Sequence, residues 1–137
     1  MAFIGRLHPL LIHFPIALTI AAAAAEATAL HTRDERWRHL AVWNIRAAAA
    51  FAVLATMAGW RLALDELGRT TTLEWHRWSG TVAAGVMLAS ALATSRIDRR
   101  PSLIRIYRMA LFGAGALVTV AAHLGAVLVW GADFLRP

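Results

Sequence analysis

Four long apolar runs constrain the fold of this 137-residue chain more than any other feature. They extend over about residues 9–30, 40–64, 75–94 and 106–130. A bilayer core of roughly 30 Å takes about 20 apolar residues in helical form, so each run is long enough to cross a membrane. The connections are short, so neighbouring helices are expected to be antiparallel. The sequence therefore predicts an all-α membrane protein, with residues 1–137 forming one up-down bundle of four transmembrane helices.

The composition excludes several other classes of protein. Apolar residues make up 59% of the chain and charged residues 16%, whereas a soluble domain is about half apolar and a quarter charged. A chain this small cannot bury so much apolar surface in a water-facing fold. The net charge of +6 comes from arginines that lie between the apolar runs rather than in one stripe, so we expect no nucleic-acid binding. The absence of cysteine excludes disulfides, thiolate metal sites and covalent c-type haem attachment.

The arginines are unevenly distributed between the two ends of the expected bundle. One end comprises the connections after the first and third runs with the residues beside them, and its arginines are Arg33, Arg36, Arg38, Arg46, Arg96, Arg99, Arg100, Arg105 and Arg108. The other end has fewer arginines, diluted by acidic residues. The positive-inside tendency places the arginine-rich end in the cytoplasm. We therefore expect a protein of the bacterial inner membrane with both termini in the periplasm.

Two residues interrupt the first apolar run. Pro15 is expected to leave the carbonyl of Leu11 without its helical donor and to kink the helix. Glu26 lies near the cytoplasmic end, and we expect it to pair with Arg38, Arg46 or another arginine of that end.

Four of the six histidines map to the outer, periplasmic half of the expected bundle. His8 and His13 open the first run, His76 lies in the first turns of the third, and His123 lies toward the end of the fourth. Ionisable groups within membrane spans are costly and tend to be functional. The alternative is that they only make hydrogen bonds between helices.

Histidines without thiolates favour particular cofactors. A tetrapyrrole iron needs two imidazoles from facing helices, whereas zinc takes three or four converging ligands. Depths estimated from the helical rise pair His13 with His123 inside the apolar layer, where they would hold a deep haem. His8 and His76 match each other near the surface, where they could bind a second haem or hydrogen-bond a propionate or a quinone.

Two glycines near these histidines could leave space for a flat ring. Gly80 follows His76 by four residues, and Gly125 follows His123 by two. Close packing of membrane helices explains such glycines equally well.

The two ends of the chain resemble a known family. The first motif runs from Leu7 to Leu18 and reads LHPLLIHFPIAL; the second runs from His123 to Leu135 and reads HLGAVLVWGADFL. Both are similar to a family of small four-helix bacterial membrane proteins catalogued as a domain of unknown function, and the resemblance covers nearly the whole chain. Relatives occur beside or fused to c-type cytochrome or Rieske-like modules, which implies a redox setting. The chain departs from the family at Trp130, where some relatives carry another histidine.

We therefore expect a membrane-anchored b-type cytochrome that holds one haem b, or two, through histidine pairs. It would pass electrons near the periplasmic face, between quinol or a larger redox complex and an outer carrier such as a c-type cytochrome. Such a chain is an electron-transfer protein or subunit rather than a stand-alone enzyme. The expected site residues are His8, His13, His76 and His123, with Gly80 and Gly125 beside the ring.

Two other functions stay open at this point. The chain could be a non-catalytic structural or assembly subunit of a larger membrane complex, without a cofactor; with or without a cofactor, we expect it to be an oligomer or a subunit of a larger complex. It could also handle copper or another metal through the same histidines.

The expected orientation can be tested by cysteine labelling, because the native chain contains no cysteine. In intact cells, an impermeant thiol reagent should label the Arg69→Cys variant, whose site is expected in the periplasm, and should leave Asp98→Cys unlabelled. The reverse pattern of labelling would contradict the orientation.

Overall fold

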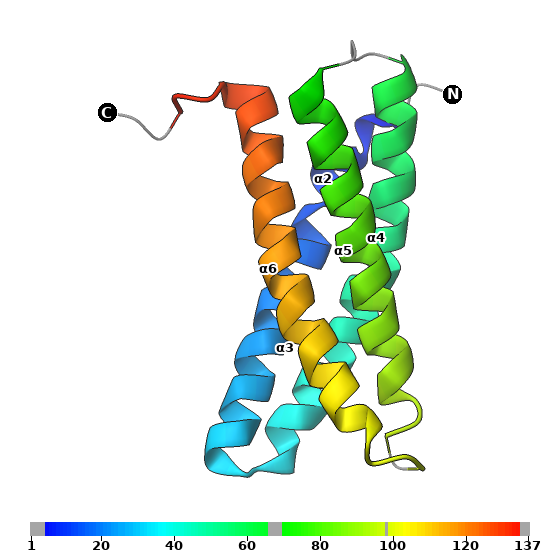
Figure 1. The fold of residues 1–137 in the computed structure, drawn as a ribbon, viewed down its shortest axis with the longest axis vertical. Helices are drawn as coiled ribbons and strands as arrows, with labels where there is room; N and C mark the ends of the chain where they lie inside the picture. The colour runs from blue at the N-terminus through cyan, green and yellow to red at the C-terminus, as the bar shows by residue number, and fades with distance from the viewer. Residues whose placement is uncertain (1–4, 66–69, 98, 135–137) are drawn as a thin grey trace.

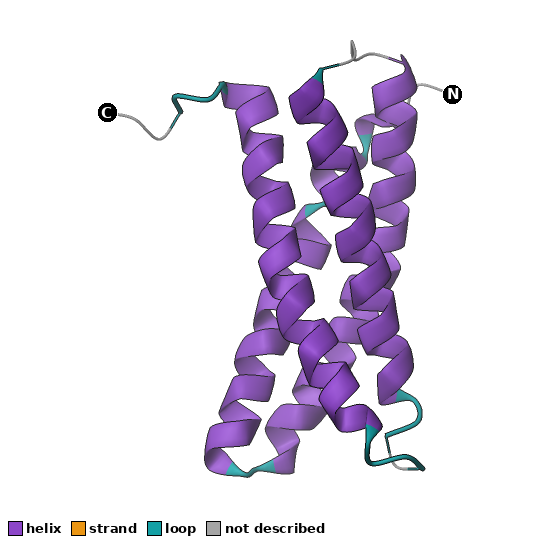
Figure 2. Cartoon of the chain, viewed as in Figure 1, coloured by secondary structure: helices purple, strands orange, loops and turns teal. Residues whose placement is uncertain are grey.

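The structure is a computed structural model that describes residues 5–65, 70–97 and 99–134. All its regular elements in these ranges are helical (Figure 2). Four are long: α3 (His13–Thr32), α4 (Glu35–Asp65), α5 (Thr71–Thr94) and α6 (Leu103–Trp130). A single-turn helix, α2 (His8–Leu11), precedes them. The all-α prediction is therefore confirmed for the part of the chain that is described.

The last three long helices begin earlier than the apolar runs predicted. They start at Glu35, Thr71 and Leu103, three to five residues before the expected positions 40, 75 and 106. Hydropathy detects the apolar part of a helix, whereas helical hydrogen bonding continues through the polar residues that flank it. The apolar runs therefore underestimate helix length.

Consecutive long helices run in opposite directions and lie side by side as two hairpins (Figure 1). The most extensive contacts are between α5 and α6 and between α3 and α4, and the contact of α3 with α6 is smaller. Both ends of the described chain lie at one end of the bundle, which we call the terminal end. The α3–α4 and α5–α6 connections lie at the other, the connection end (Figure 1).

The first helical segment is broken one residue after Leu11. Helix α2 ends there and α3 begins at His13. Pro15 has no N–H to give to the Leu11 carbonyl, and its ring crowds that oxygen, so the break follows from the proline. The predicted kink is therefore confirmed, and it places His8 and His13 on separate helical segments.

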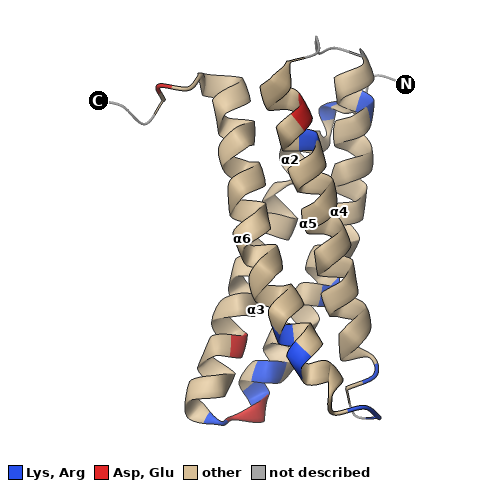
Figure 3. Cartoon of the chain, in the orientation of Figure 1, with Lys and Arg blue, Asp and Glu red and all other residues tan. Residues whose placement is uncertain are grey.

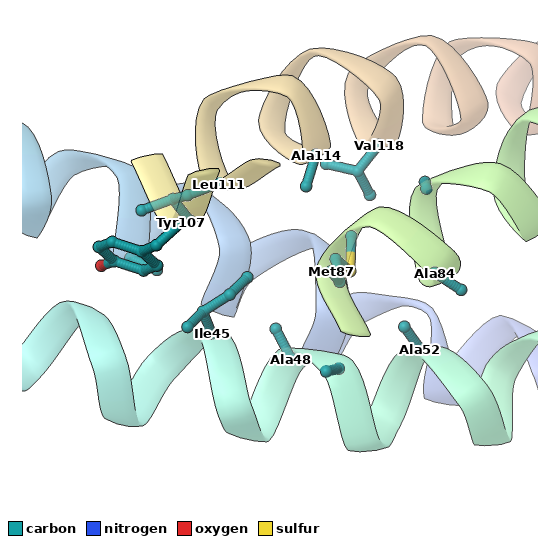
Figure 4. Packing of buried hydrophobic residues seen from close by; sticks show 12 residues of the cluster. Ile45, Ala48, Ala52, Ala84, Met87, Tyr107, Leu111, Ala114 and Val118 are labelled. Carbon is teal, nitrogen blue, oxygen red and sulfur yellow. The ribbon is translucent and has the colours of Figure 1, made fainter. Parts of the chain in front are cut away.

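The interior of the bundle is built largely from alanine. Ala22, Ala48 and Ala114 are fully buried. Ala48 and Ala114 pack in one cluster with larger side chains such as Ile45 and Leu111 (Figure 4). Many large apolar side chains instead face outward. Small residues allow membrane helices to approach closely, while large apolar residues contact lipid. The distribution is therefore that of a membrane protein.

Three helical segments are long and apolar enough to cross a membrane. They are His8–Thr32, Glu35–Leu64 and Leu103–Trp130. Charged residues gather toward the two ends of the bundle (Figure 3). The chain is therefore a membrane protein with at least these three candidate spans.

A buried carboxylate joins three helices near the connection end. The side chain of Glu26, on α3, is fully buried. Its Oε1 accepts a hydrogen bond of 2.8 Å from Arg108 Nε and lies 3.5 Å from Arg38 Nε, while the Tyr107 hydroxyl donates to Oε2 over 3.1 Å. The expected pairing with Arg38 is confirmed. Arg46 instead donates to the Thr94 hydroxyl over 2.8 Å.

Loss of this carboxylate should destabilise the bundle. Glu26→Ala leaves two arginines and a tyrosine hydroxyl without their shared acceptor, which should lower the free energy of unfolding by about 3–5 kcal/mol. Denaturant unfolding in detergent micelles measures the loss. The matched control is Glu35→Gln, because the exposed Glu35 also pairs with Arg38, at 2.8 Å; its loss should be at most about 1 kcal/mol. Equal losses for the two variants would contradict the assigned role of Glu26.

Candidate cofactor-binding site

A cavity of about 700 Å³ lies in the terminal half of the bundle, with residues from α2 and all four long helices in its wall. Its lining is mostly apolar, and three of the expected histidines, His8, His13 and His76, belong to it. Cofactor pockets typically enclose roughly 300–1,000 Å³ and combine an apolar lining with a few polar groups. The cavity therefore has the size and lining of a cofactor site.

His8 is held by the backbone of the neighbouring helix α4. Its Nδ1 lies 2.8 Å from the carbonyl oxygen of Ala55, and the side chain is half-buried. A carbonyl oxygen can only accept, so Nδ1 carries the proton in this contact. The Nε2 atom of the neutral ring then keeps its lone pair, which is the state that a metal ion requires.

His76 is held in the same way by the other hairpin. Its Nδ1 lies 2.9 Å from the carbonyl oxygen of Ala121 on α6. The same argument leaves Nε2 of His76 as a free electron-pair donor. Each hairpin thus supplies one imidazole whose tautomer and ring position are set by a backbone carbonyl.

Each of these rings packs directly against a glycine of the neighbouring helix. A Cβ atom added to Gly59 would lie 2.8 Å from Cε1 of His8, and one added to Gly125 would lie 3.0 Å from Cε1 of His76. Each glycine follows the accepting alanine by four residues, so it stands one helical turn above the carbonyl. The missing side chain gives the imidazole access to that carbonyl. In both hairpins, therefore, an Ala-x-x-x-Gly segment holds a histidine: the alanine carbonyl accepts its N–H and the glycine leaves space for its ring. We call this segment the seat of the histidine.

The two seated imidazoles face the same cavity at close range. The ring centroids of His8 and His76 are 6.1 Å apart, and the ring planes are inclined by 77°. Two imidazoles that bind one metal ion through single nitrogens, each at about 2.0–2.1 Å, hold their centroids about 6 Å apart. The spacing therefore fits a pair of axial ligands. This donor set suits an iron whose remaining positions are filled by a macrocycle.

The structure does not bring His13 and His123 together at this cavity. His13 is exposed and belongs to the cavity wall, whereas the ring of His123 is exposed and lies 5.8 Å from that of Phe134. His123 is two residues from both Ala121 and Gly125, which serve His76. Residues two apart on a helix lie about 200° apart around its axis, so His123 is on the opposite face of α6. Of the two pairs expected from depth, the structure brings His8 and His76 together, whereas His123 lies outside the cavity wall that includes His13.

The two glycines expected beside the ring have different surroundings. Gly80 belongs to the cavity wall, and a Cβ atom there would meet nothing within 4 Å. Gly125 supports His76 rather than serving His123. Gly59 was not expected, although a signal was present: its Ala-x-x-x-Gly segment recurs at Gly125, and the accepting alanines follow their histidines by 47 and 45 residues.

Within residues 5–65, 70–97 and 99–134, no group of three or more histidine, cysteine, aspartate or glutamate side chains could hold a metal ion. The remaining two histidines, His31 and His39, are exposed near the connection end. The donor set of the cavity is therefore the pair of seated imidazoles, with His13 on the wall.

Comparison with known proteins identifies one family. Residues 6–134 match a family described as "Predicted membrane protein (DUF2231)". No match was found among curated proteins or among solved structures.

The seat of His8 can be tested by adding one methyl group. Gly59→Ala should displace the imidazole and weaken its hydrogen bond, whereas Gly80→Ala meets open space and should gain helix propensity. We expect Gly59→Ala to be about 1–2 kcal/mol less stable than Gly80→Ala. Thermal unfolding of the ligand-free protein in detergent compares them. Equal stabilities would show that Gly59 does not support the ring.

Proposed function

We propose that this chain, which belongs to the DUF2231 family of predicted membrane proteins, is a membrane-anchored b-type cytochrome that binds one haem between His8 and His76. The observation that carries the proposal is the pair of imidazoles 6.1 Å apart, each anchored through Nδ1 to a backbone carbonyl. Haem binding through two histidines of facing helices uses this donor set. The apolar cavity around the pair provides room for a flat, largely apolar ring.

Bound haem would supply one-electron transfer, and the chain's own groups would control its setting. The carbonyls of Ala55 and Ala121 keep the ring N–H of each histidine on Nδ1, which makes Nε2 more basic. Leu73, Ala83 and Ala84 are buried members of the cavity wall. Their apolar surface excludes water from the site and so influences the reduction potential.

All four long helices cross the membrane in this proposal. Helix α5 lies between α4 and α6 in the arrangement of Figure 1 and runs alongside both. Its charged residues Glu74 and Arg77 fall in its first two turns, and residues 78–94 carry no charge. Spanning by α5 keeps the α3–α4 and α5–α6 connections on one side, where most arginines lie.

The site then lies near the periplasmic face of the bacterial inner membrane. Electrons would pass between quinol, or a larger redox complex, and an outer carrier such as a c-type cytochrome. The cavity lies toward the terminal end of the bundle, which is periplasmic in the orientation favoured by the arginines. This position suits exchange with a carrier outside the membrane.

Absorption spectra of the purified protein, oxidised and dithionite-reduced, test the proposal. We expect the split visible bands of a low-spin b-type haem. His8→Ala and His76→Ala should abolish the low-spin spectrum or convert it to a high-spin one, because each removes an axial ligand. His31→Ala and His123→Ala are the controls, since both side chains are exposed and neither belongs to the cavity wall.

Other outcomes would favour the other functions. A colourless protein without iron would contradict haem binding and support a structural or assembly subunit. Copper without porphyrin in a metal analysis would support a metal-handling protein. A low-spin spectrum that is lost in His123→Ala but kept in His8→Ala would contradict the assigned ligand pair.

A further inference from the structure

Among the described residues that line the cavity, the charged one is Arg77, which follows His76 directly in α5. Its guanidinium carbon lies 3.8 Å from the centre of the Trp60 ring, a close cation–π contact. Trp60 is itself fixed, because its indole N–H donates to the Thr81 hydroxyl over 3.0 Å and its ring packs edge-on against Trp78. The guanidinium is therefore held in one position beside the cavity.

The Nε atom of Arg77 is buried and has no hydrogen-bond acceptor among the described residues. A buried donor without an acceptor costs free energy, and the cost is larger for a charged group. Stacking on Trp60 covers a face of the guanidinium but uses none of its N–H donors, which lie in its plane. The site thus holds a positioned cation whose donor lacks an acceptor.

Another buried arginine nitrogen without a hydrogen bond among the described residues, in Arg38, has different surroundings from that of Arg77. Arg38 Nε also lacks a hydrogen bond within the described part of the chain, but it lies 3.5 Å from Glu26, and Arg38 also pairs with Glu35. Its charge therefore has carboxylate partners. No ion pair described in the structure includes Arg77.

We propose that Arg77 binds a carboxylate group of the ligand that occupies the cavity. Resting on the proposed haem function, this group is a haem propionate. Haem is an apolar macrocycle with two carboxylates, and the cavity offers a largely apolar wall with one fixed guanidinium. An arginine binds a carboxylate through charge-assisted hydrogen bonds, so Arg77 would both increase affinity and select the orientation of the ring relative to His76.

Haem b and its dimethyl ester provide the test, because the ester differs only in having neutral side groups. Both are titrated into ligand-free wild type and Arg77→Gln in the same detergent, and the ratio of their dissociation constants is compared. The ratio of the ester's dissociation constant to that of the free acid should be about tenfold to a hundredfold larger in wild type than in Arg77→Gln. Comparing ratios removes the different partition of the two compounds into detergent.

Matched variants separate this contact from general effects of charge. Arg61→Gln removes a charge from the exposed surface of α4, outside the cavity wall, and should keep the wild-type ratio. Arg77→Lys keeps the charge but not the planar donors, so its ratio should fall between those of wild type and Arg77→Gln. If Arg77→Gln fails to fold, this lysine variant makes the comparison.

Each alternative result has a distinct meaning. If both compounds bind wild type and Arg77→Gln with the same ratio, the assignment of Arg77 is wrong while haem binding stands. If Arg77→Gln loses co-purified phospholipid and the ratio is unchanged, Arg77 binds a lipid phosphate and the assignment is again wrong. If neither compound binds wild type, the proposed function and this inference both fail.

Discussion

The association of the helices in this bundle depends on a few polar contacts between them. Within a bilayer, apolar side chains gain little free energy by exchanging lipid contacts for contacts with another helix, so helices associate by close packing and by interior polar contacts. Near the connection end, Glu26 joins α3 to α4 and α6. Near the terminal end, His8 ties α2 to α4 and His76 ties α5 to α6, each within its own hairpin. The cavity lies at this end, where the two histidines face each other.

The site follows from two copies of one local arrangement. In each hairpin an alanine carbonyl accepts an imidazole N–H, and a glycine one turn later gives the ring room to approach. The carbonyl determines which nitrogen is protonated, and the glycine determines where the ring lies. Two imidazoles that would hold one metal ion need a fixed tautomer and a fixed ring orientation, which the carbonyl contact provides on both sides. The arrangement therefore explains Gly59 and Gly125 together with the histidines that they support.

The buried charged groups have different surroundings at the two ends of the bundle. Glu26 is enclosed by two arginines and a tyrosine, so its charge is used within the fold. Arg77 is fixed by Trp60, yet its buried Nε has no acceptor among the described residues. A satisfied buried charge holds helices together, whereas a positioned cation without an acceptor is ready for an anionic ligand.

The sequence by itself determined the helical class, the break that Pro15 causes and the pairing of Glu26 with arginines of the connection end, because these depend on local hydropathy, backbone chemistry and charge. Which arginines pair with it, Arg38 and Arg108, was decided by the packing of the helices. The sequence also placed four histidines at one end. Depth along the helices gave two pairs, His8 with His76 and His13 with His123, and only the tertiary structure decided that the first pair meets at the cavity. In a membrane helix both the interior and the lipid-facing sides are apolar, so hydropathy does not fix the rotation of a helix about its axis. The packing of α6 on α5 sets that rotation, and it turns Gly125 toward His76 and His123 away from it.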